Sequence, residues 1–280
     1  MKRWILFIAI LVVMVIAFYI GYQKAIAPKP STRFEQISPA AAQQELAKRN
    51  IEFNADTFFQ CAELGYTEVI KLFLLAGMDP NTKGKYDTTA LMHAALSGHL
   101  ETAKLLVDNN ADVNARMKGS TTALMAAVST TGNTEMATLL LARGADVNAR
   151  DIVGKPVLMF AVIGGDNKTI QFLIDKGADV NASSDQLGLT ILMAAAKDGK
   201  TEAVNLLIKK GANVNAQTSR GFTALWAAAE RGHIETVKLL LEKGAEINAK
   251  TQNGETALRI AIRKGYSDIV QLLRQAGAKE

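Results

Sequence analysis

The chemically reactive residues of this chain are few and do not form a recognisable catalytic set. The three histidines are His93, His99 and His233, and the single cysteine is Cys61. His93 stands beside Met92 in an apolar stretch, which is typical of a packed histidine rather than a general base. Cys61 occupies a position where a small apolar residue belongs, and a buried thiol is inert. A single cysteine also excludes an intrachain disulfide and a cysteine-rich metal site.

The aspartates that look like a metal-binding series are spaced about one structural repeat apart. They are Asp79, Asp112, Asp146 and Asp179. In stacked helix pairs this spacing corresponds to about 10 Å, which is too far for one ion, so we interpret them as turn-forming residues. The pair Gly164-Gly165 lacks the Gly-Lys-Ser/Thr ending of a phosphate cradle. The sequence therefore predicts no metal site, no cofactor and no small-molecule substrate.

One short phrase recurs every 33 or 34 residues and organises most of the chain. It reads Gly-Ala-Asp-Val-Asn-Ala at residues 144–149 and 177–182, and related forms begin at Gly77, Asn110, Gly211 and Gly244. A fixed period of this length indicates a stacked array, because so small a unit cannot bury its own apolar face. Binding positions are therefore expected on a surface rather than in a central cleft.

Each unit repeats a two-helix pattern from about residue 51 onward. In one of them a helix begins at Thr223, Gly232 breaks it, and a second helix follows with Val237 and Leu240 at helical spacing. The break glycine recurs in all seven units, as expected where a helix ends in a left-handed conformation: Gly65, Gly98, Gly132, Gly165, Gly199, Gly232 and Gly265.

These features resemble the ankyrin-repeat family. The family's Thr-Pro-Leu-His opening has counterparts at residues 89–92, 122–125 and 223–226, and the pairs Gly98-His99 and Gly232-His233 match its Gly-His pair. The resemblance implies an all-α solenoid of about seven helix-turn-helix units over residues 51–280, joined by short β-hairpin loops, with structural roles for those two histidines. Methionine replaces the family's usual histidine in four openings, and we expect thioether packing to take the place of its hydrogen bonds: Met92, Met125, Met159 and Met193.

Two insertions and a polar last unit depart from the regular pattern. One extra residue lies within 128–131 and should alter a corner between helices, and another lies within 183–187 and should lengthen a loop. Such an insertion can mark a contact site, and drift in a tolerant loop explains it equally well. The last unit is typical of a terminal cap and predicts a complete array, because polar groups replace apolar ones at Arg259, Arg263, Lys264, Arg274 and Gln275.

The amino-terminal residues form a long uncharged run. From Trp4 to Tyr22 nineteen residues carry no charge, and a helix of this length spans about 28 Å, close to the hydrocarbon thickness of a bilayer. We therefore expect an uncleaved transmembrane signal anchor over residues 1–22. The alternatives are a signal peptide cleaved after Ala27 and a buried soluble helix. The length of the run and the position of Pro28 just after the cleavage site disfavour cleavage.

Positive charges flank this run almost equally, so the positive-inside rule alone does not orient it. The charges are Lys2 and Arg3 before the run, and Lys24, Lys29 and Arg33 after it. Because the leading charges are contiguous and the leading tail is short, we interpret the run as an anchor with the repeats translocated. In a bacterium this places the repeat domain in the periplasm.

The sequence predicts a tether and one further helix between the anchor and the repeats. Residues 23–38 contain Pro28 and Pro30 in a polar stretch, which is typical of an extended linker. Residues 39–50 are rich in helix formers and follow Ser38, a residue type that favours a helix start.

The resemblance also implies where a partner would bind. In ankyrin-like arrays the loop tips and the exposed side of the first helices line a concave groove, and arginine and aromatic residues among apolar ones are typical of protein interfaces. Solvated loop tips would give a similar pattern. The candidate partner-binding residues are Lys83, Lys85, Tyr86, Arg116, Met117, Lys118, Arg150, Ile152, Val153, Lys155, Asp185, Gln186, Leu187, Arg220 and Phe222.

The predicted function is protein binding at a membrane by a scaffold without catalytic activity. The basic tips favour an acidic protein partner or anionic lipid headgroups. A net charge of +5 with a pI near 9.2 is too mild to indicate nucleic-acid binding. Two alternatives stay open, namely an enzyme or enzyme subunit that uses the inserted loop near Asp185, and a secreted binding protein released by signal cleavage.

Overall fold

The computed structural model describes residues 37–130, 133–184 and 187–279. The predicted anchor at residues 1–22 and most of the predicted linker at residues 23–38 lie outside these residues. Among the helices of the described segments, none combines the length and the apolarity that a bilayer crossing requires. The described residues form two compact units. Unit 1 runs to Lys85 and includes Thr89–Ala111, and unit 2 comprises Tyr86–Thr88 and the residues from Asp112 onward.

Threonine side chains start the first helix of most repeats, which we call the inner helix. Thr223 has an extended backbone, and its hydroxyl accepts a hydrogen bond of 3.1 Å from the amide N–H of Trp226. Such a bond satisfies one of the N–H groups that the first turn of a helix leaves without an intrahelical acceptor. Four other inner helices are capped in the same way, by Thr89, Thr122, Thr190 and Thr256.

Glycine in a left-handed conformation ends these helices where the sequence predicted it. The C-cap residues Gly98, Gly165, Gly232 and Gly265 have φ values of 78°, 81°, 79° and 78°. A residue with a side chain is strained in this conformation, and glycine is not. The glycine therefore turns the chain sharply into the second helix of the repeat, which we call the outer helix. Gly132 lies outside the described residues.

Unit 1 contains a leading helix and two helix pairs. The leading helix α2 (Pro39–Lys48) packs on the first outer helix, and the amide of Gln43 donates a hydrogen bond of 3.2 Å to the carbonyl of Ala76. The pairs are α3 (Ala55–Glu63) with α4 (Thr67–Leu75), and α5 (Ala90–Ser97) with α6 (Leu100–Asp108).

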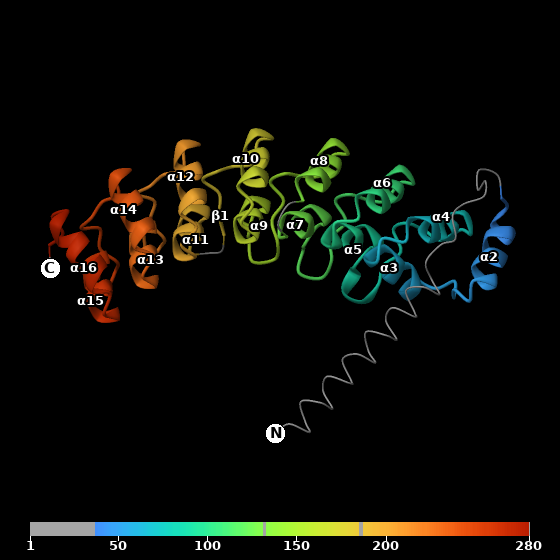
Figure 1. Cartoon of the computed structure of the whole chain (residues 1–280), viewed down its shortest axis with the longest axis horizontal. Helices are drawn as coiled ribbons and strands as arrows, with labels where there is room; N and C mark the ends of the chain where they lie inside the picture. The colour runs from blue at the N-terminus through green and yellow to red at the C-terminus, as the bar shows by residue number, and fades with distance from the viewer. Residues whose placement is uncertain (1–36, 131–132, 185–186, 280) are drawn as a thin grey trace, which may run out of the picture. The chain divides into compact units, whose positions relative to one another are not determined.

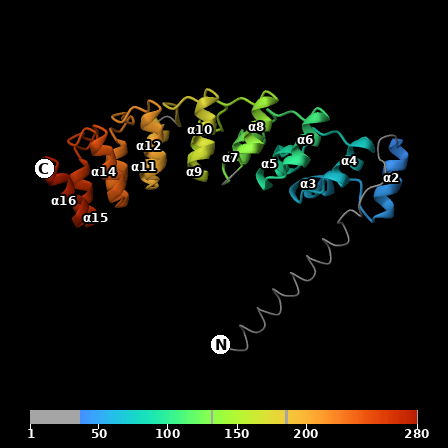
Figure 2. The ribbon, with the colours of Figure 1, turned by 45° about the horizontal axis from the view of Figure 1, so that its top comes forward.

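Unit 2 contains five helix pairs, which brings the described residues to the seven pairs that the sequence predicted. Its inner helices follow one another in chain order, and its outer helices lie along one side of them (Figures 1 and 2). The pairs are α7 (Ala123–Val128) with α8 (Thr134–Ala142), α9 (Val157–Gly164) with α10 (Asn167–Asp175), α11 (Ile191–Lys197) with α12 (Thr201–Lys209), α13 (Ala224–Arg231) with α14 (Ile234–Glu242), and α15 (Ala257–Lys264) with α16 (Ser267–Gln275).

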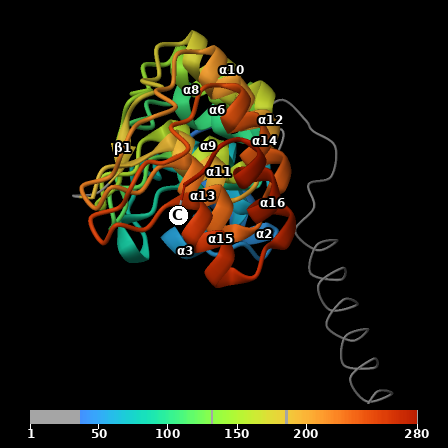
Figure 3. The same cartoon turned by 90° about the vertical axis from the view of Figure 1, so that its left-hand side faces the viewer.

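The loops that join the repeats of unit 2 project to one side of the helices (Figure 3). Of the predicted β-hairpin loops, one shows paired strands in the described residues. These residues contain one strand pair, β1 (Ser183–Ser184) with β2 (Leu189–Thr190), and one isolated bridge between Arg150 and Pro156. Other loops of unit 2 close through backbone hydrogen bonds without strand pairing, such as Thr218 N–H to the Phe222 carbonyl at 3.0 Å and Gly221 N–H to the Thr218 carbonyl at 2.8 Å. A short 3-10 helix, η1 (Lys85–Asp87), lies in the loop before α5.

The asparagine of the recurring phrase joins successive repeats. The side chain of Asn148 donates a hydrogen bond of 3.1 Å to the Gly177 carbonyl and accepts one of 3.0 Å from the Asp179 N–H. Asn114, Asn181 and Asn215 bridge to the following repeat in the same way. The aspartates cap the turn, since the Asn148 N–H donates to Asp146 Oδ1 at 2.9 Å. The phrase therefore recurs because it holds one repeat at a fixed distance from the next.

The apolar core lies within and between the helix pairs. The inner helices contribute many alanines, such as Ala94 and Ala228, because small side chains let neighbouring helices approach closely. The four methionines that replace the family's usual histidine are all buried, which confirms the expectation that they pack in the core: Met92, Met125, Met159 and Met193.

Candidate protein-binding site

The described candidate residues lie at the loop tips, and most are exposed. The apolar side chains of Ile152, Val153 and Leu187 are 74%, 53% and 40% exposed. Met117, Lys155 and Phe222 are half-buried, and the other described candidates are exposed. Lys83 and Lys85 belong to unit 1, and the remaining described candidates belong to unit 2. Asp185 and Gln186 lie outside the described residues.

Two of the candidate arginines are engaged within the stack. Arg116 Nη1 donates a hydrogen bond of 2.8 Å to the carbonyl of Arg150, and Arg150 Nη1 donates one of 2.5 Å to the carbonyl of Ser183 and one of 2.9 Å to the carbonyl of Gly154. Each guanidinium thus ties its own loop to the next loop. Sequence reasoning did not anticipate this role, because the acceptors lie 33 and 34 residues away.

Backbone hydrogen bonds also join neighbouring loop tips of unit 2. The N–H of Ile152 donates to the Gly119 carbonyl at 2.9 Å, and the N–H of Ser219 donates to the Leu187 carbonyl at 2.7 Å. The N–H of Gln252 donates to the Arg220 carbonyl at 2.9 Å. These bonds hold the tip side chains in fixed relative positions. A surface ordered in advance loses little conformational entropy when a partner binds.

Three candidate residues from two successive loops converge on one hollow in unit 2. Leu187, Arg220 and Phe222 line a space of about 270 Å³ together with Trp226 of α13. The remaining walls come from β2, α11, α13 and the loop before α13: Leu189, Met193, Lys197, Thr218, Thr223, Ala227 and Glu230. This hollow, which we call the Trp226 hollow, combines an apolar lining with a few polar groups, as protein and ligand sites do.

The indole of Trp226 has an unused hydrogen-bond donor. Its ring packs against Phe222 with centroids 4.3 Å apart and planes at 41°. Its Nε1–H is buried and has no hydrogen-bond partner among the described residues. A buried donor without a partner costs about 1–3 kcal/mol, so an acceptor that reached this N–H would bind favourably.

The charged side chains around the Trp226 hollow are mainly basic. Lys197 and Arg220 are exposed, while Glu230 is half-buried with its Oε2 3.9 Å from the Arg231 Nε. The excess of positive charge favours an acidic segment of a partner, in line with the expectation from the loop tips.

Trp226 and Lys197 are candidate binding residues that sequence reasoning missed. Trp226 occupies the opening position that carries methionine in four other repeats, and the exchange to the largest aromatic residue was the available signal. Lys197 gave no signal, because only the stack places the end of α11 beside the loop that holds Arg220.

The reactive residues have the packing roles that the sequence predicted. The ring of His93 stacks on that of Phe59 with centroids 5.6 Å apart, and its Nδ1 is 3.8 Å from a carboxylate oxygen of Glu63. Burial lowers the pKa of His93, and the Glu63 charge opposes this only in part. Cys61 is buried, which raises the pKa of its thiol to about 12. In the described part of the chain, no group of three or more His, Cys, Asp or Glu side chains could hold a metal ion.

Comparison with known proteins identifies the repeat. A family model described as ankyrin repeats matches three stretches, residues 58–151, 158–251 and 214–280. This chain belongs to the ankyrin-repeat family. Ankyrin repeats generally serve as scaffolds for protein–protein interaction, and the fold is typically non-catalytic.

A solved ankyrin structure supports the assignment. The chain is similar to the crystal structure of the human ASB11 ankyrin repeat domain, with a TM-score of 0.72 and 26% sequence identity. The match covers 80% of this chain and 98% of that domain. A search of curated proteins finds no match to this sequence.

Proposed function

We propose that this protein is a membrane-anchored ankyrin scaffold that binds another protein through the loop tips and inner helices of its repeats. It has no catalytic activity of its own. The anchor is the uncharged run Trp4–Tyr22, and the repeats lie on the outer side of the membrane.

The main support for the proposed protein binding is the Trp226 hollow. Three residues chosen from the sequence as partner contacts line it, although they come from different loops. Aromatic and arginine side chains dominate the binding energy of many protein interfaces. The apolar lining of the hollow favours an apolar side chain of the partner, and its charges favour an acidic residue beside that side chain. The partner segment is therefore expected to combine an apolar anchor with neighbouring carboxylates.

A direct binding measurement tests the site. The chain has two tryptophans, so the variant Trp4→Phe leaves Trp226 as the single reporter of the hollow. A partner captured from the native membrane is purified and titrated into this variant, and the emission of Trp226 is followed. We expect a saturable change in emission. Leu187→Asp in the same background should weaken binding about tenfold or more, because it places a charge in the apolar lining.

Ile163→Asp is the matched control. Ile163 is 46% exposed, close to the 40% of Leu187, and it is not among the residues that line the Trp226 hollow. Ile163→Asp should leave the affinity unchanged. Equal affinities of the wild-type chain and Leu187→Asp would show that the partner binds elsewhere.

The membrane part of the proposal needs a separate test. Protease added to intact spheroplasts should digest the repeats if they are translocated, and the repeats should sediment with the membrane fraction. Amino-terminal sequencing of the mature protein distinguishes an anchored chain from one cleaved after Ala27. Protection of the repeats in intact spheroplasts would contradict the proposed orientation.

A further inference from the structure

In four of the described repeats, the glycine that ends the inner helix leaves a space that a side chain of the next repeat occupies, and we call this space a seat. A Cβ added to Gly65 or Gly199 would fall within 3 Å of the imidazole ring of His99 or His233, respectively. A Cβ on Gly232 would lie 2.8 Å from the Tyr266 ring. Because the glycine has no side chain, a side chain of the next repeat can occupy this space.

Two kinds of side chain in these seats donate hydrogen bonds to the end of the preceding inner helix. The Nε2 atoms of His99 and His233 lie 2.9 Å from the carbonyl oxygens of Glu63 and Lys197. Above Gly165, Lys200 Nζ donates to the Val162 carbonyl at 2.7 Å. The last carbonyls of a helix carry partial negative charge and need donors, which explains this preference.

In the two repeats with a seated histidine, the neighbouring outer helices also share a hydrogen bond between threonine hydroxyls. Thr67 and Thr102 share a hydroxyl hydrogen bond of 2.8 Å, and so do Thr201 and Thr236. In both cases the first threonine begins an outer helix two residues after the seat glycine, and the second threonine lies three residues after the seated histidine. A third pair, Thr134 with Thr169 at 2.7 Å, has Asp166 at the position of the histidine, and the glycine of that repeat, Gly132, lies outside the described residues. Where the seat glycine is described, the hydroxyl pair occurs together with a histidine in the seat.

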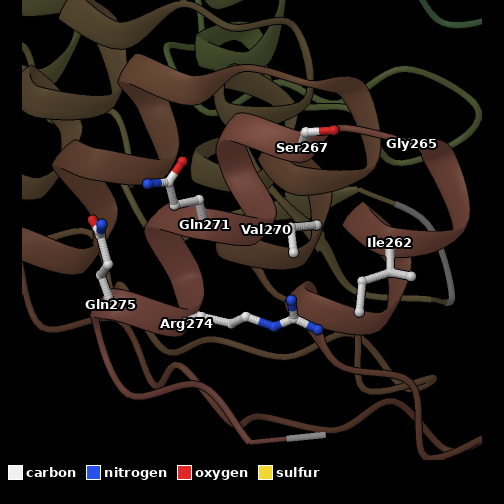
Figure 4. A pocket seen from close by; sticks show the side chains of 7 residues that line it. All are labelled: Ile262, Gly265, Ser267, Val270, Gln271, Arg274 and Gln275. Carbon is white, nitrogen blue, oxygen red and sulfur yellow. The ribbon is translucent and has the colours of Figure 1, made fainter.

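The last repeat has the same glycine and the same hydroxyl, but no further repeat packs on them among the described residues. Gly265 has a φ of 78°, and no described atom lies within 4 Å of a Cβ built on it. Ser267 begins α16 two residues later and supplies the hydroxyl. With Ile262 and Val270, these residues line an open hollow of about 520 Å³ (Figure 4).

Residues that line this hollow correspond to residues that are buried between neighbouring repeats elsewhere in the stack. Ile262 is 45% exposed, whereas Val162 and Ala229, which hold the same place in α9 and α13, are fully buried. Val270 is half-buried, whereas its counterpart Val237 in α14 is fully buried. The polar residues that the sequence assigned to a cap are exposed, and the apolar side chains of Ile262 and Val270 lie at the centre of this end face.

We propose that the end face formed by α15 and α16 binds a helix of another protein that places a histidine side chain on Gly265. The Nε2–H of this histidine donates to the Arg263 carbonyl, and a hydroxyl three residues later pairs with Ser267. Arg274 lines the hollow that contains the seat, and Lys264 precedes Gly265 in the chain, so acidic neighbours in the partner are favoured. A second copy of this chain is disfavoured, because α2 packs on α4, where the outer helix of a preceding repeat would lie.

The chain itself supplies a probe for this site. A synthetic peptide with the sequence of residues 232–244 contains His233, Thr236 and Val237 in the spacing that covers Gly199 in the stack. The peptide is titrated into the full chain labelled with [15N]glycine, and the signal of Gly265 is followed. The matched control peptide carries a methyl group on Nε2 of its histidine, which removes the donor and keeps the ring.

We expect a saturable shift of the Gly265 signal, with binding about fivefold weaker for the methylated peptide. Gly265→Asn should abolish binding, because asparagine tolerates the left-handed conformation and its side chain fills the seat. Gly254→Asn is the control, since Gly254 has a φ of 72° and is equally open but lies in a loop. Binding of the peptide is read from the peptide signals in both variants.

Three results would overturn the proposal. They are no binding of the peptide, equal affinity of the two peptides, and equal affinity of the Gly265→Asn and Gly254→Asn variants. Self-association of the wild-type chain in sedimentation that Gly265→Asn prevents would also overturn it, because the occupant would then be a second copy. The test is independent of the Trp226 hollow, since none of its variants changes a residue that lines that hollow.

Discussion

The Nε2 atom of His233 lies 2.9 Å from the carbonyl oxygen of Lys197, so one side chain connects the start of α14 to the end of α11 in the preceding repeat. The same imidazole ring fills the space beside Gly199. A histidine that looks reactive in the sequence therefore serves the packing between two repeats.

His233→Ala should lower the free energy of unfolding by about 1–3 kcal/mol, because the Lys197 carbonyl loses its donor and a cavity opens beside Gly199. Urea unfolding followed by circular dichroism measures this change. His233→Gln keeps a donor of similar length and should restore part of the loss. An unchanged unfolding midpoint in His233→Ala would contradict this role.

Gly232→Ala should destabilise the chain more than Gly254→Ala. Both glycines have a left-handed backbone, with φ of 79° and 72°, so both variants carry a conformational cost of about 1 kcal/mol. Only at Gly232 would the new Cβ also collide with the Tyr266 ring, at 2.8 Å. Thermal unfolding of the two variants isolates the contribution of the ring contact. Equal melting temperatures would show that Tyr266 moves away freely.

Arg150→Ala should mainly lower the stability of the chain, whereas Arg220→Ala should mainly weaken partner binding. Arg150 donates hydrogen bonds to the carbonyls of Gly154 and Ser183, so its loss should lower the free energy of unfolding by about 1–2 kcal/mol. Arg220 is exposed beside the Trp226 hollow, so its loss should weaken partner binding and leave unfolding almost unchanged. Both variants are measured by urea unfolding and by titration with the partner, and the opposite outcome would reverse the two roles.

Acidification should destabilise the chain through His93. Burial lowers the pKa of His93 in the folded chain below its unfolded value of about 6.5, so the unfolded chain binds the proton more readily. The loss of stability begins as the pH falls through the unfolded pKa and is complete below the folded pKa. His93→Gln should flatten the pH dependence of the unfolding midpoint between about pH 7 and 5. Identical pH profiles of the wild-type chain and the variant would contradict this effect.

Cys61 should resist thiol reagents while the chain is folded. Burial raises the pKa of this thiol to about 12, and the thiolate is the reactive form. At pH 8, Ellman's reagent should react with one thiol in urea and with almost none in buffer. Rapid reaction in buffer would show that α3 opens readily.

The repeat and its helix pairs were predictable from the sequence because their signals are local. Thr223 caps α13 through an amide three residues away, and Gly232 ends it through its own backbone freedom. Sequence reasoning therefore found all seven helix pairs of the described residues. It predicted strand pairing in the loops more widely than the one strand pair of the described residues shows.

The candidate site was predictable only in part. The periodic pattern identified the loop tips, and with them Leu187, Arg220 and Phe222. It could not tell Arg150, whose donors are used within the stack, from Arg220, because the carbonyl of Ser183 comes from the next loop. Trp226 and Lys197 likewise acquired their place beside the hollow only when two repeats were stacked.

The sequence by itself determined the family, the number of repeats and the packing roles of its histidines and cysteine, because caps, breaks and apolar spacing act within a few residues. The tertiary structure alone decided which tip side chains are available to a partner, and it showed that the centre of the last repeat's end face is apolar. Those properties depend on groups about 33 residues apart along the chain, which become neighbours only in the stack.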